Sequence, residues 1–349
     1  MRAIGTVISP ERRIRNAWKR EYFRGRGSLD NLTHSLVGAL IGQAGLKRKT
    51  GLAMPALVIG ANLPDVDAAC LFWLDGVEHL GFRRGITHGP PAMLLLPLML
   101  AGALWGWDRW QAQRGTRPAA RLPVSFKWLY ALAFIGCLTH PALDWLNVYG
   151  IRLLEPFSSR WFYGDVLFII DVWLWAILGI GLWLSLRREK HEREWRRPAW
   201  IAGLMGLAYI GLNGLITVGS ERAVRDVTGA ELVIASPIPL RFWERELISA
   251  DDWFGYQING MYRVGDKSIG DCWLDLARES NDQVDAFLFW SRAPIVVADP
   301  SGDGWLLRDA RYLDLRAVDR FTVKFDQDVC LRLVTRDFDL KVTPTDPSS

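Results

Sequence analysis

Two unbroken apolar runs limit the fold of this chain more than any other feature of its sequence. Val166–Leu186 has 21 residues with a single charge, Asp171, and Ala199–Gly219 has 21 residues with none. A helix needs about 20 apolar residues to cross the roughly 30 Å hydrocarbon core of a bilayer. The two runs therefore predict transmembrane helices.

Four further apolar runs precede these two. Pro91–Trp107 and Trp128–Trp145 are slightly short but strongly apolar, whereas Leu32–Leu46 and Leu52–Leu63 are too short to span a bilayer comfortably alone. We expect the two short runs to be tilted, re-entrant or packed inside the bundle, with a buried core helix as the alternative. Many tryptophans at the ends of the runs fit an interfacial aromatic belt.

Charge and hydropathy change together after residue 219. Residues 1–219 contain 26 Lys/Arg and 15 Asp/Glu, whereas residues 220–349 contain 16 and 23. The basic residues lie between apolar runs and not on one continuous face, which argues against a nucleic-acid-binding protein. The second region instead alternates apolar and polar residues, as in Tyr256–Val264, Ala286–Trp290 and Phe321–Phe325, with turn signals between the stretches. This pattern predicts antiparallel strands.

We therefore expect an α-helical polytopic membrane domain at residues 29–219, followed by a small β-rich extramembrane domain at 220–349. Three basic loops, Lys47–Lys49, Asp108–Lys127 and Arg187–Arg197, fall on one side if each intervening hairpin crosses the bilayer twice. The positive-inside rule makes that side cytoplasmic and places residues 220–349 outside the cytoplasm.

The positive charge of the N-terminal segment does not fit this orientation. Residues 1–28 contain eight Lys/Arg, yet no full span separates them from His34. They form either a cytoplasmic basic arm, with a different first crossing or a reversed orientation, or a disordered extension. A start-site artefact, with translation beginning near Leu29, is the remaining interpretation.

Ionisable residues are concentrated at the ends of the apolar runs. Each costs about 2.5–3.5 kcal/mol at the centre of a membrane helix, so such groups usually mark function. Three histidines follow threonine, two aspartates flank Val66 after a proline, and one aspartate stands four residues after a histidine. A spacing of four places both side chains on one helix face, as a metal site requires. The candidate metal ligands are His34, Asp65, Asp67, His88, His140 and Asp144.

The predicted topology brings all six candidates, together with Asp165, to the non-cytoplasmic side. Each residue alone has a simpler interpretation. A lone histidine is usually a hydrogen-bonded core residue, Asp65 can cap a helix, and Asp144 can pair with Arg152. Taken together, three histidines and three aspartates at membrane-embedded ends favour a metal site.

Four sequence blocks also carry a resemblance to a known family. They are DNLTHSLVG from Asp30, residues 61–67, RRGITHG from Arg83, and THPALDWLNVYG from Thr139. In this order they resemble the YdjM-type family, interpreted as bacterial inner-membrane metal-dependent hydrolases, over about residues 29–219. The family is distantly similar to the helical zinc-dependent phospholipase C and single-strand nuclease group, which binds zinc through His and Asp. Many shorter members carry His where Arg84 stands.

The hypothesis from these observations is a membrane-bound hydrolase with zinc or another divalent metal, using a metal-activated water. Asp165 is a candidate general base or further ligand, and Arg83 and Arg84 are candidates to neutralise a phosphate ester or phospholipid substrate. Asn62, Asn147 and the threonines before each histidine are candidates to orient the ligands. The alternatives are a non-catalytic membrane scaffold or regulatory protein with a structural metal, and an ion transporter.

Overall fold

A computed structural model of the chain describes residues 27–250, 256–259, 262–264, 278–279, 281–300, 304–313 and 320–325. Most of the predicted N-terminal extension thus lies outside the described residues. The chain divides into two compact units. The first consists of Met1–Leu71, Arg84–Gly214 and Pro239–Phe242, and the second of Phe72–Arg83, Leu215–Ile238 and Trp243–Ser349.

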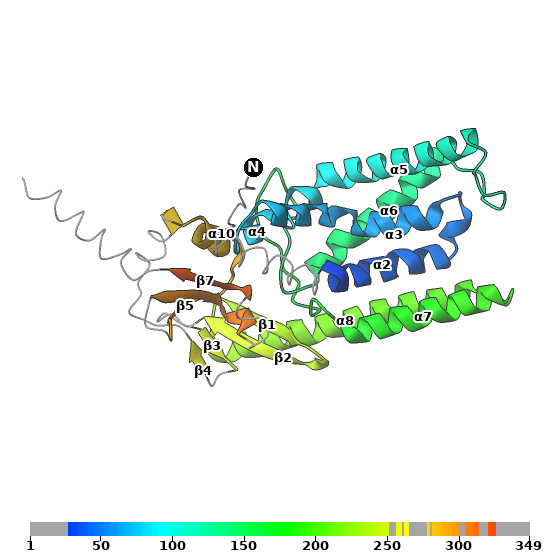
Figure 1. Ribbon diagram of the computed structural model, residues 1–349. Coiled ribbons are helices and arrows are strands. Elements are labelled where there is room, and N and C mark those ends of the chain that lie inside the picture. The colour runs from blue at the N-terminus through cyan, green and yellow to red at the C-terminus, as the bar shows by residue number, and fades with distance from the viewer. Residues whose placement is uncertain are drawn as a thin grey trace, which may run out of the picture. The chain divides into compact units, whose positions relative to one another are not determined.

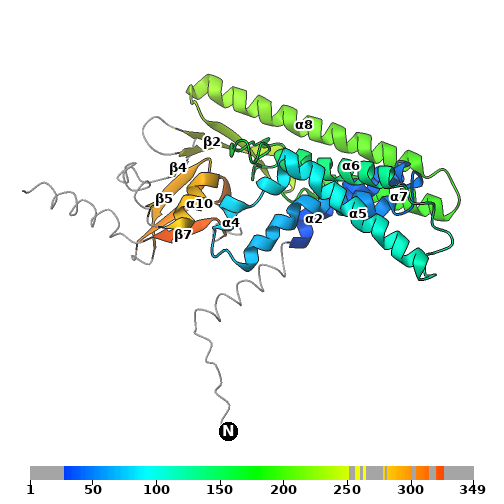
Figure 2. The ribbon, with the colours of Figure 1, turned by 90° about the horizontal axis from the view of Figure 1, so that it is seen from above.

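The first unit is built from helices that run alongside one another, with successive long helices pointing in opposite directions (Figures 1 and 2). Its elements are α2 Gly27–Gln43, η1 Leu46–Arg48, α3 Ala53–Asn62, η2 Leu63–Phe72, η3 Ile86–His88, α5 Pro90–Gln113, α6 Phe126–Trp145, α7 Val172–Lys190 and the first part of α8 Arg196–Thr228. After Gly214, α8 belongs to the second unit. This mostly helical region, followed by small antiparallel sheets, confirms the predicted fold class.

Three of the described helices are long and apolar enough to cross a membrane: Ala53–Phe72, Pro90–Gln113 and Arg196–Thr228. The first of these corrects the expectation that Leu52–Leu63 is too short. The chain continues past Asn62 as a 3₁₀ helix to Phe72, so Pro64 does not end the helical segment. A proline near the start of a helical turn lacks only a donor that has no partner there in any case.

The two runs predicted as the clearest spans have different boundaries from those expected. Asp171 is the N-cap of α7, and its Oδ1 accepts hydrogen bonds from the backbone N–H of Trp173 (3.1 Å) and Leu174 (2.9 Å). Residues 166–171 therefore precede the helix, and α7 is not among the three membrane-length helices. The next helix, α8, continues beyond Gly219 to Thr228.

Tight backbone contacts place α3 between α2 and α6. A Cβ atom at Gly136 would lie 2.5 Å from the Leu57 carbonyl oxygen, and one at Gly60 would lie 2.6 Å from the Ala133 carbonyl oxygen. Glycine at a helix interface lets two backbones approach closely, which strengthens dispersion contacts. The contact is continued by buried residues of α3, α5 and α6, including Leu57 and Leu132.

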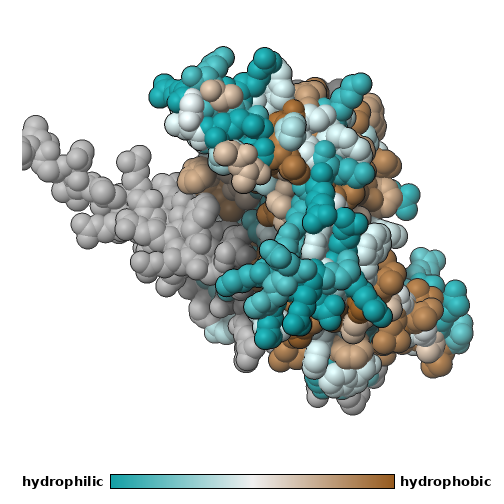
Figure 3. Space-filling model, turned by 90° about the vertical axis from the view of Figure 1, so that its right-hand side faces the viewer, coloured by the Kyte–Doolittle hydropathy of each residue, from teal (hydrophilic) through white to brown (hydrophobic). Residues whose placement is uncertain are grey.

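Basic residues gather at one end of the first unit, where α2 meets α3, α5 meets α6 and α7 meets α8. Figure 3 views the molecule from that side, and hydrophilic residues cover much of its surface. Lys47, Arg48 and Arg196 lie over the ring of Trp195 at 4.2, 5.2 and 5.4 Å from its centroid. The three predicted basic loops thus share one end of the helical unit.

The second unit contains most of the β structure. The strands are β1 Val233–Ile238, β2 Arg241–Ala250, β3 Tyr256–Ile258, β4 Tyr262–Val264, β5 Pro294–Ala298, β6 Trp305–Asp309 and β7 Thr322–Phe325, with helices α4 His79–Phe82 and α10 Asp282–Trp290. They form a four-stranded sheet in the order β1-β2-β3-β4 and a three-stranded sheet in the order β5-β6-β7.

The strand predicted at Ala286–Trp290 is wrong, because these residues belong to α10. Asn281 caps the helix through a hydrogen bond to the Gln283 N–H, and Val284, Phe287 and Trp290 are buried at a spacing of three. That spacing fits a helix face rather than one face of a sheet. The alternating stretch Tyr256–Val264 forms two short strands, β3 and β4, which pair antiparallel.

The close approach at Gly136 yields a stability prediction. Gly136→Ala should lower the free energy of unfolding by about 1–3 kcal/mol, because the new methyl group meets a backbone carbonyl that has little freedom to move. Gly179→Ala in α7 is the matched control, since nothing lies within 4 Å of its Cβ position. Thermal unfolding in detergent micelles, followed by circular dichroism, measures both. Equal stability of the two variants would contradict the packing argument.

Candidate metal centre

Five chain segments meet at the end of the helical unit opposite the basic loops. They are the start of α2, the continuation of α3, the segment before α5, the end of α6 and the segment before α7. Because successive helices alternate in direction, these ends share one side of the unit (Figure 1). The six predicted ligands all lie on the first four of these segments.

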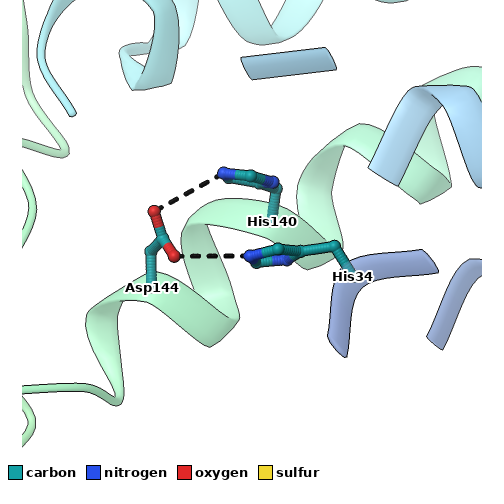
Figure 4. Close-up of side chains that lie close together, drawn as sticks. All are labelled: His34, His140 and Asp144. Carbon is teal, nitrogen blue, oxygen red and sulfur yellow. Dashed lines mark ion pairs between the residues drawn. The ribbon is translucent and has the colours of Figure 1, made fainter. Parts of the chain in front are cut away.

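Two overlapping groups of side chains at this end have the composition of a metal site. One consists of His34, His140 and Asp144, and the other of Asp65, His88 and His140; within each group the ligand atoms lie within 4.8 Å of one another. In Figure 4 the rings of His34 and His140 stack and both point toward Asp144. The two ring centroids are 3.8 Å apart.

The Asp144 carboxylate lies between three imidazoles. Its Oδ1 is 3.5 Å from His34 Nε2, and its Oδ2 is 3.5 Å from both His88 Nε2 and His140 Nε2. Asp65 Oδ1 approaches the same nitrogen of His140 at 3.7 Å. Ligand atoms bound tetrahedrally at about 2.1 Å from a zinc ion lie about 3.4 Å from one another, so each of these pairs of atoms has about the separation of two ligands of one cation.

Because this cluster is buried, a polar atom in it that lacks a hydrogen-bond partner is energetically unfavourable. The exposed fractions of His34, His88, His140 and Asp144 are 2%, 1%, 0% and 1%. His88 Nε2 and His140 Nε2 have no hydrogen-bond partner among the described residues. A buried polar atom without a partner costs about 1–3 kcal/mol, and a bound cation would remove that cost for both. The donor set therefore fits a divalent metal.

The backbone of α3 fixes the orientation of His140. Its Nδ1 lies 2.7 Å from the carbonyl oxygen of Ala61, so the nitrogen that faces the carbonyl carries the hydrogen. The lone pair then belongs to Nε2, the atom that faces Asp65 and Asp144. Gly60 and Gly136 make this contact short enough, since they set the distance between α3 and α6.

Asp67 and Thr87 orient His88. Thr87 Oγ1 lies 3.0 Å from His88 Nδ1 and donates to Asp67 Oδ2 at 3.2 Å, while Asp67 Oδ2 lies 3.6 Å from the same imidazole nitrogen. The structure places Asp67 behind His88 and outside the two candidate groups. The 3₁₀ conformation explains this, because side chains two residues apart on such a helix point in different directions.

Arg84 connects three of the converging segments. Its Nε lies 3.1 Å from Asp144 Oδ2, its Nη1 donates to Asn147 Oδ1 at 2.9 Å, and its backbone N–H donates to Asp67 Oδ2 at 2.7 Å. The side chain also lies over the ring of Tyr149, 4.6 Å from the centroid. Arg84 is 3% exposed and has a left-handed backbone conformation with φ of 55°. Its observed partners are thus protein groups around the cluster.

The remaining predicted residues are not members of the two groups. Asp165 is buried in the segment before α7, with φ of 51°, and Arg83 belongs to the second compact unit. Asn62 donates to Ser35 Oγ at 3.0 Å and so joins α3 to α2. Of the threonines, Thr87 is the one that contacts a histidine ring in the described hydrogen bonds, because Thr33 bonds Trp175 and Thr139 bonds the Gly136 carbonyl.

The sequence assigned no role in the site to Arg152. This residue is 7% exposed, donates from its backbone N–H to the Arg84 carbonyl at 3.0 Å, and pairs with Glu155 at 2.9 Å. Burial lowers the pKa of its guanidinium, and the Glu155 carboxylate opposes that shift. The simpler interpretation had paired Arg152 with Asp144, whereas Asp144 pairs with Arg84. No spacing rule in the sequence distinguishes the two arginines.

Comparison with known proteins identifies the family of this chain. The family model described as YdjM inner membrane protein matches residues 29–219, and the chain belongs to that family. No curated protein matches the chain. No solved structure matches it either.

The buried Arg84–Asp144 pair yields a second stability prediction. With metal removed by a chelator, Arg84→Gln should lower the free energy of unfolding by about 3–5 kcal/mol, because it leaves a buried carboxylate without its cation. Arg84→Lys should lose less stability, since lysine keeps the positive charge but lacks the planar, forked N–H donors of arginine. Denaturant unfolding in micelles measures both, with Arg160→Gln at an exposed position as control. An Arg84→Gln variant as stable as the control would contradict the assignment.

Proposed function

We propose that this protein is a membrane-bound, metal-dependent hydrolase whose substrate is a phosphate ester or phospholipid. The observation that carries the proposal is the approach of His34, His88 and His140 to the Asp144 carboxylate at 3.5 Å each, about the separation of two ligand atoms of one cation. Asp65 completes a second group around the same His140 nitrogen. A mixture of imidazole and carboxylate ligands favours zinc or manganese.

Each residue has a role that follows from its contacts. The three imidazoles and Asp144 would hold the cation, and the hydrogen bond from His140 to Ala61 and the contacts of His88 with Thr87 and Asp67 keep their nitrogens aimed at it. A bound divalent cation supplies Lewis acidity and lowers the pKa of a water ligand. Arg84 holds Asp144 in place, which supports a positioning role for this arginine.

The proposed location is a bacterial inner membrane, crossed several times by the helical unit. The basic loops at the opposite end are proposed to face the cytoplasm, which would direct the metal centre and the β-rich region toward the periplasm. Asp165 and Arg83 remain candidates for a general base and for an anion-binding group.

One observation favours a second candidate function. Four of the candidate ligands are at most 2% exposed, and a closed coordination shell is typical of a structural metal. In that case the protein would be a membrane scaffold or regulatory protein stabilised by the ion. Metal binding is common to both candidates, and turnover distinguishes them.

Metal analysis of the purified protein tests metal binding, which both candidate functions require. Wild-type protein should retain near-stoichiometric divalent metal, whereas His140→Ala and Asp144→Ala should lose most of it, because each removes a ligand from a four-coordinate site. His191→Ala is the matched control, since this histidine is the exposed C-cap residue of α7. Equally negligible metal in wild type and variants would refute the site.

The residues that orient His88 yield a graded prediction. Asp67→Asn should weaken metal affinity by about 10- to 100-fold while leaving the metal stoichiometry unchanged, as expected for a group that orients a ligand without binding the ion itself. Competition with a fluorescent chelator measures the affinity. Loss of stoichiometry equal to that of Asp144→Ala would instead make Asp67 a ligand.

Hydrolysis of phosphomonoester and phosphodiester panels by the metal-loaded protein tests the activity. Turnover by wild type that is abolished in Asp144→Ala is the expected result. Metal binding without turnover of any panel member would favour the scaffold.

A further inference from the structure

An exposed apolar tip lies on the irregular segment between α6 and α7. Phe157 is 77% exposed and Leu154 is 44% exposed. Neither residue belongs to a helix or strand, so the lipid-facing surface of a transmembrane helix does not account for them. We define Leu154 and Phe157 as the apolar tip.

The segment that carries the apolar tip packs on the segment that carries His88. A Cβ atom at Gly89 would overlap the carbonyl oxygen of Glu155, which follows Leu154. The Arg152 N–H bonds the carbonyl of Arg84, whose guanidinium pairs with Asp144. The apolar tip is thus connected by direct backbone contacts to the candidate metal centre, within the same compact unit.

Other apolar side chains are exposed next to the candidate ligands. Val66, between Asp65 and Asp67, is 48% exposed, and Ile86, two residues before His88, is 59% exposed. Trp145, directly after Asp144, is 46% exposed. Asp65 is also the most exposed member of the two ligand groups. We call Val66, Ile86 and Trp145 the apolar border of the centre.

A bilayer is the partner that fits this border. The same unit contains helices long enough to cross a membrane, and His88 lies immediately before one of them, Pro90–Gln113. Irregular backbone is not tolerated against lipid in the hydrocarbon core, whereas apolar side chains on a loop insert favourably into the headgroup and acyl boundary. Tryptophan at a helix end is typical of that same boundary.

We propose that the apolar tip docks into the bilayer interface beside the metal centre, and that the substrate is therefore a phospholipid resident in the bilayer and not a soluble phosphate ester. The inference rests on the proposed hydrolase function. Its reaction is hydrolysis: water adds to a phosphoester bond, the ester bond breaks, and the proton goes to the leaving oxygen. The docking part, however, is independent of catalysis.

Depth measurement tests docking directly. The variants Phe157→Cys and Ala119→Cys, each in a background without the four native cysteines, are labelled with an environment-sensitive fluorophore in nanodiscs of phosphatidylethanolamine and phosphatidylglycerol. Ala119 is an exposed residue of the α5–α6 loop and serves as the control. The label at 157 should be quenched by lipid-attached nitroxide and protected from aqueous iodide, and the control label should behave oppositely. Iodide quenching at both positions would overturn docking.

Activity tests the substrate class. Phe157→Ser should lower kcat/KM for phosphatidylglycerol in nanodiscs by about fivefold or more, because it removes much of the partition energy of a phenylalanine side chain. Hydrolysis of soluble bis(p-nitrophenyl) phosphate should remain unchanged. Phe157→Leu, which keeps an apolar side chain, should retain most lipid hydrolysis. Its retention separates membrane docking from a structural defect.

The outcomes separate this inference from the proposed function. Turnover of the soluble diester without any lipid hydrolysis would overturn the lipid substrate and leave the hydrolase intact. Equal losses on both substrates in Phe157→Ser would overturn the role of the apolar tip. No metal-dependent turnover of either substrate by wild type would overturn the hydrolase function and the lipid substrate together, while the depth measurement would still decide docking.

Discussion

The buried carboxylate of Asp144 is the group on which this end of the molecule depends. Taking a carboxylate out of water is unfavourable unless cations and donors surround it. Here His34, His88 and His140 approach it from three elements, and Arg84 pairs with it at 3.1 Å. The segments that carry these residues must therefore converge, and the chain forms helices whose ends meet at one side.

The helix packing that surrounds Asp144 with partners also orients the other candidate ligands. Gly60 and Gly136 bring α3 and α6 into backbone contact, and the next residue of α3, Ala61, uses its carbonyl to set which nitrogen of His140 is free. The same helical segment then continues as a 3₁₀ helix, on which the side chains of Asp65 and Asp67 point in different directions. Close packing, rather than a flexible loop, thus positions the ligands, which suits a site that needs fixed geometry.

The centre combines deep burial with an apolar border. Buried imidazoles and carboxylates interact strongly because little water screens them, so a cation in this place would be held firmly. The side chains of Val66, Ile86 and Phe157 are exposed on segments that carry or contact the candidate ligands, and water solvates such surface poorly. Both features have a common explanation in a site built at the end of membrane helices, where polar groups must turn inward and apolar groups outward.

The hydropathy and residue spacing of the sequence predicted the long helices and the common face of two candidate ligands. The apolar runs marked all six long helices, because burial in lipid demands apolar residues whatever the helix packs against. The spacing of His140 and Asp144 predicted their common face, since it depends on helix geometry alone. The helix at Asp282–Trp290 was missed, because a short apolar run does not distinguish a helix from a strand.

Other features were decided by the tertiary structure, because they depend on contacts between residues distant in the chain. Asp67 lies behind His88 because α3 continues past Pro64 as a 3₁₀ helix. Arg84, and not Arg152, pairs with Asp144 because the backbone N–H of Arg84 is bound to Asp67 and aims its side chain inward. The sequence determined which residues carry the charge, and only three-dimensional packing decided which charges meet.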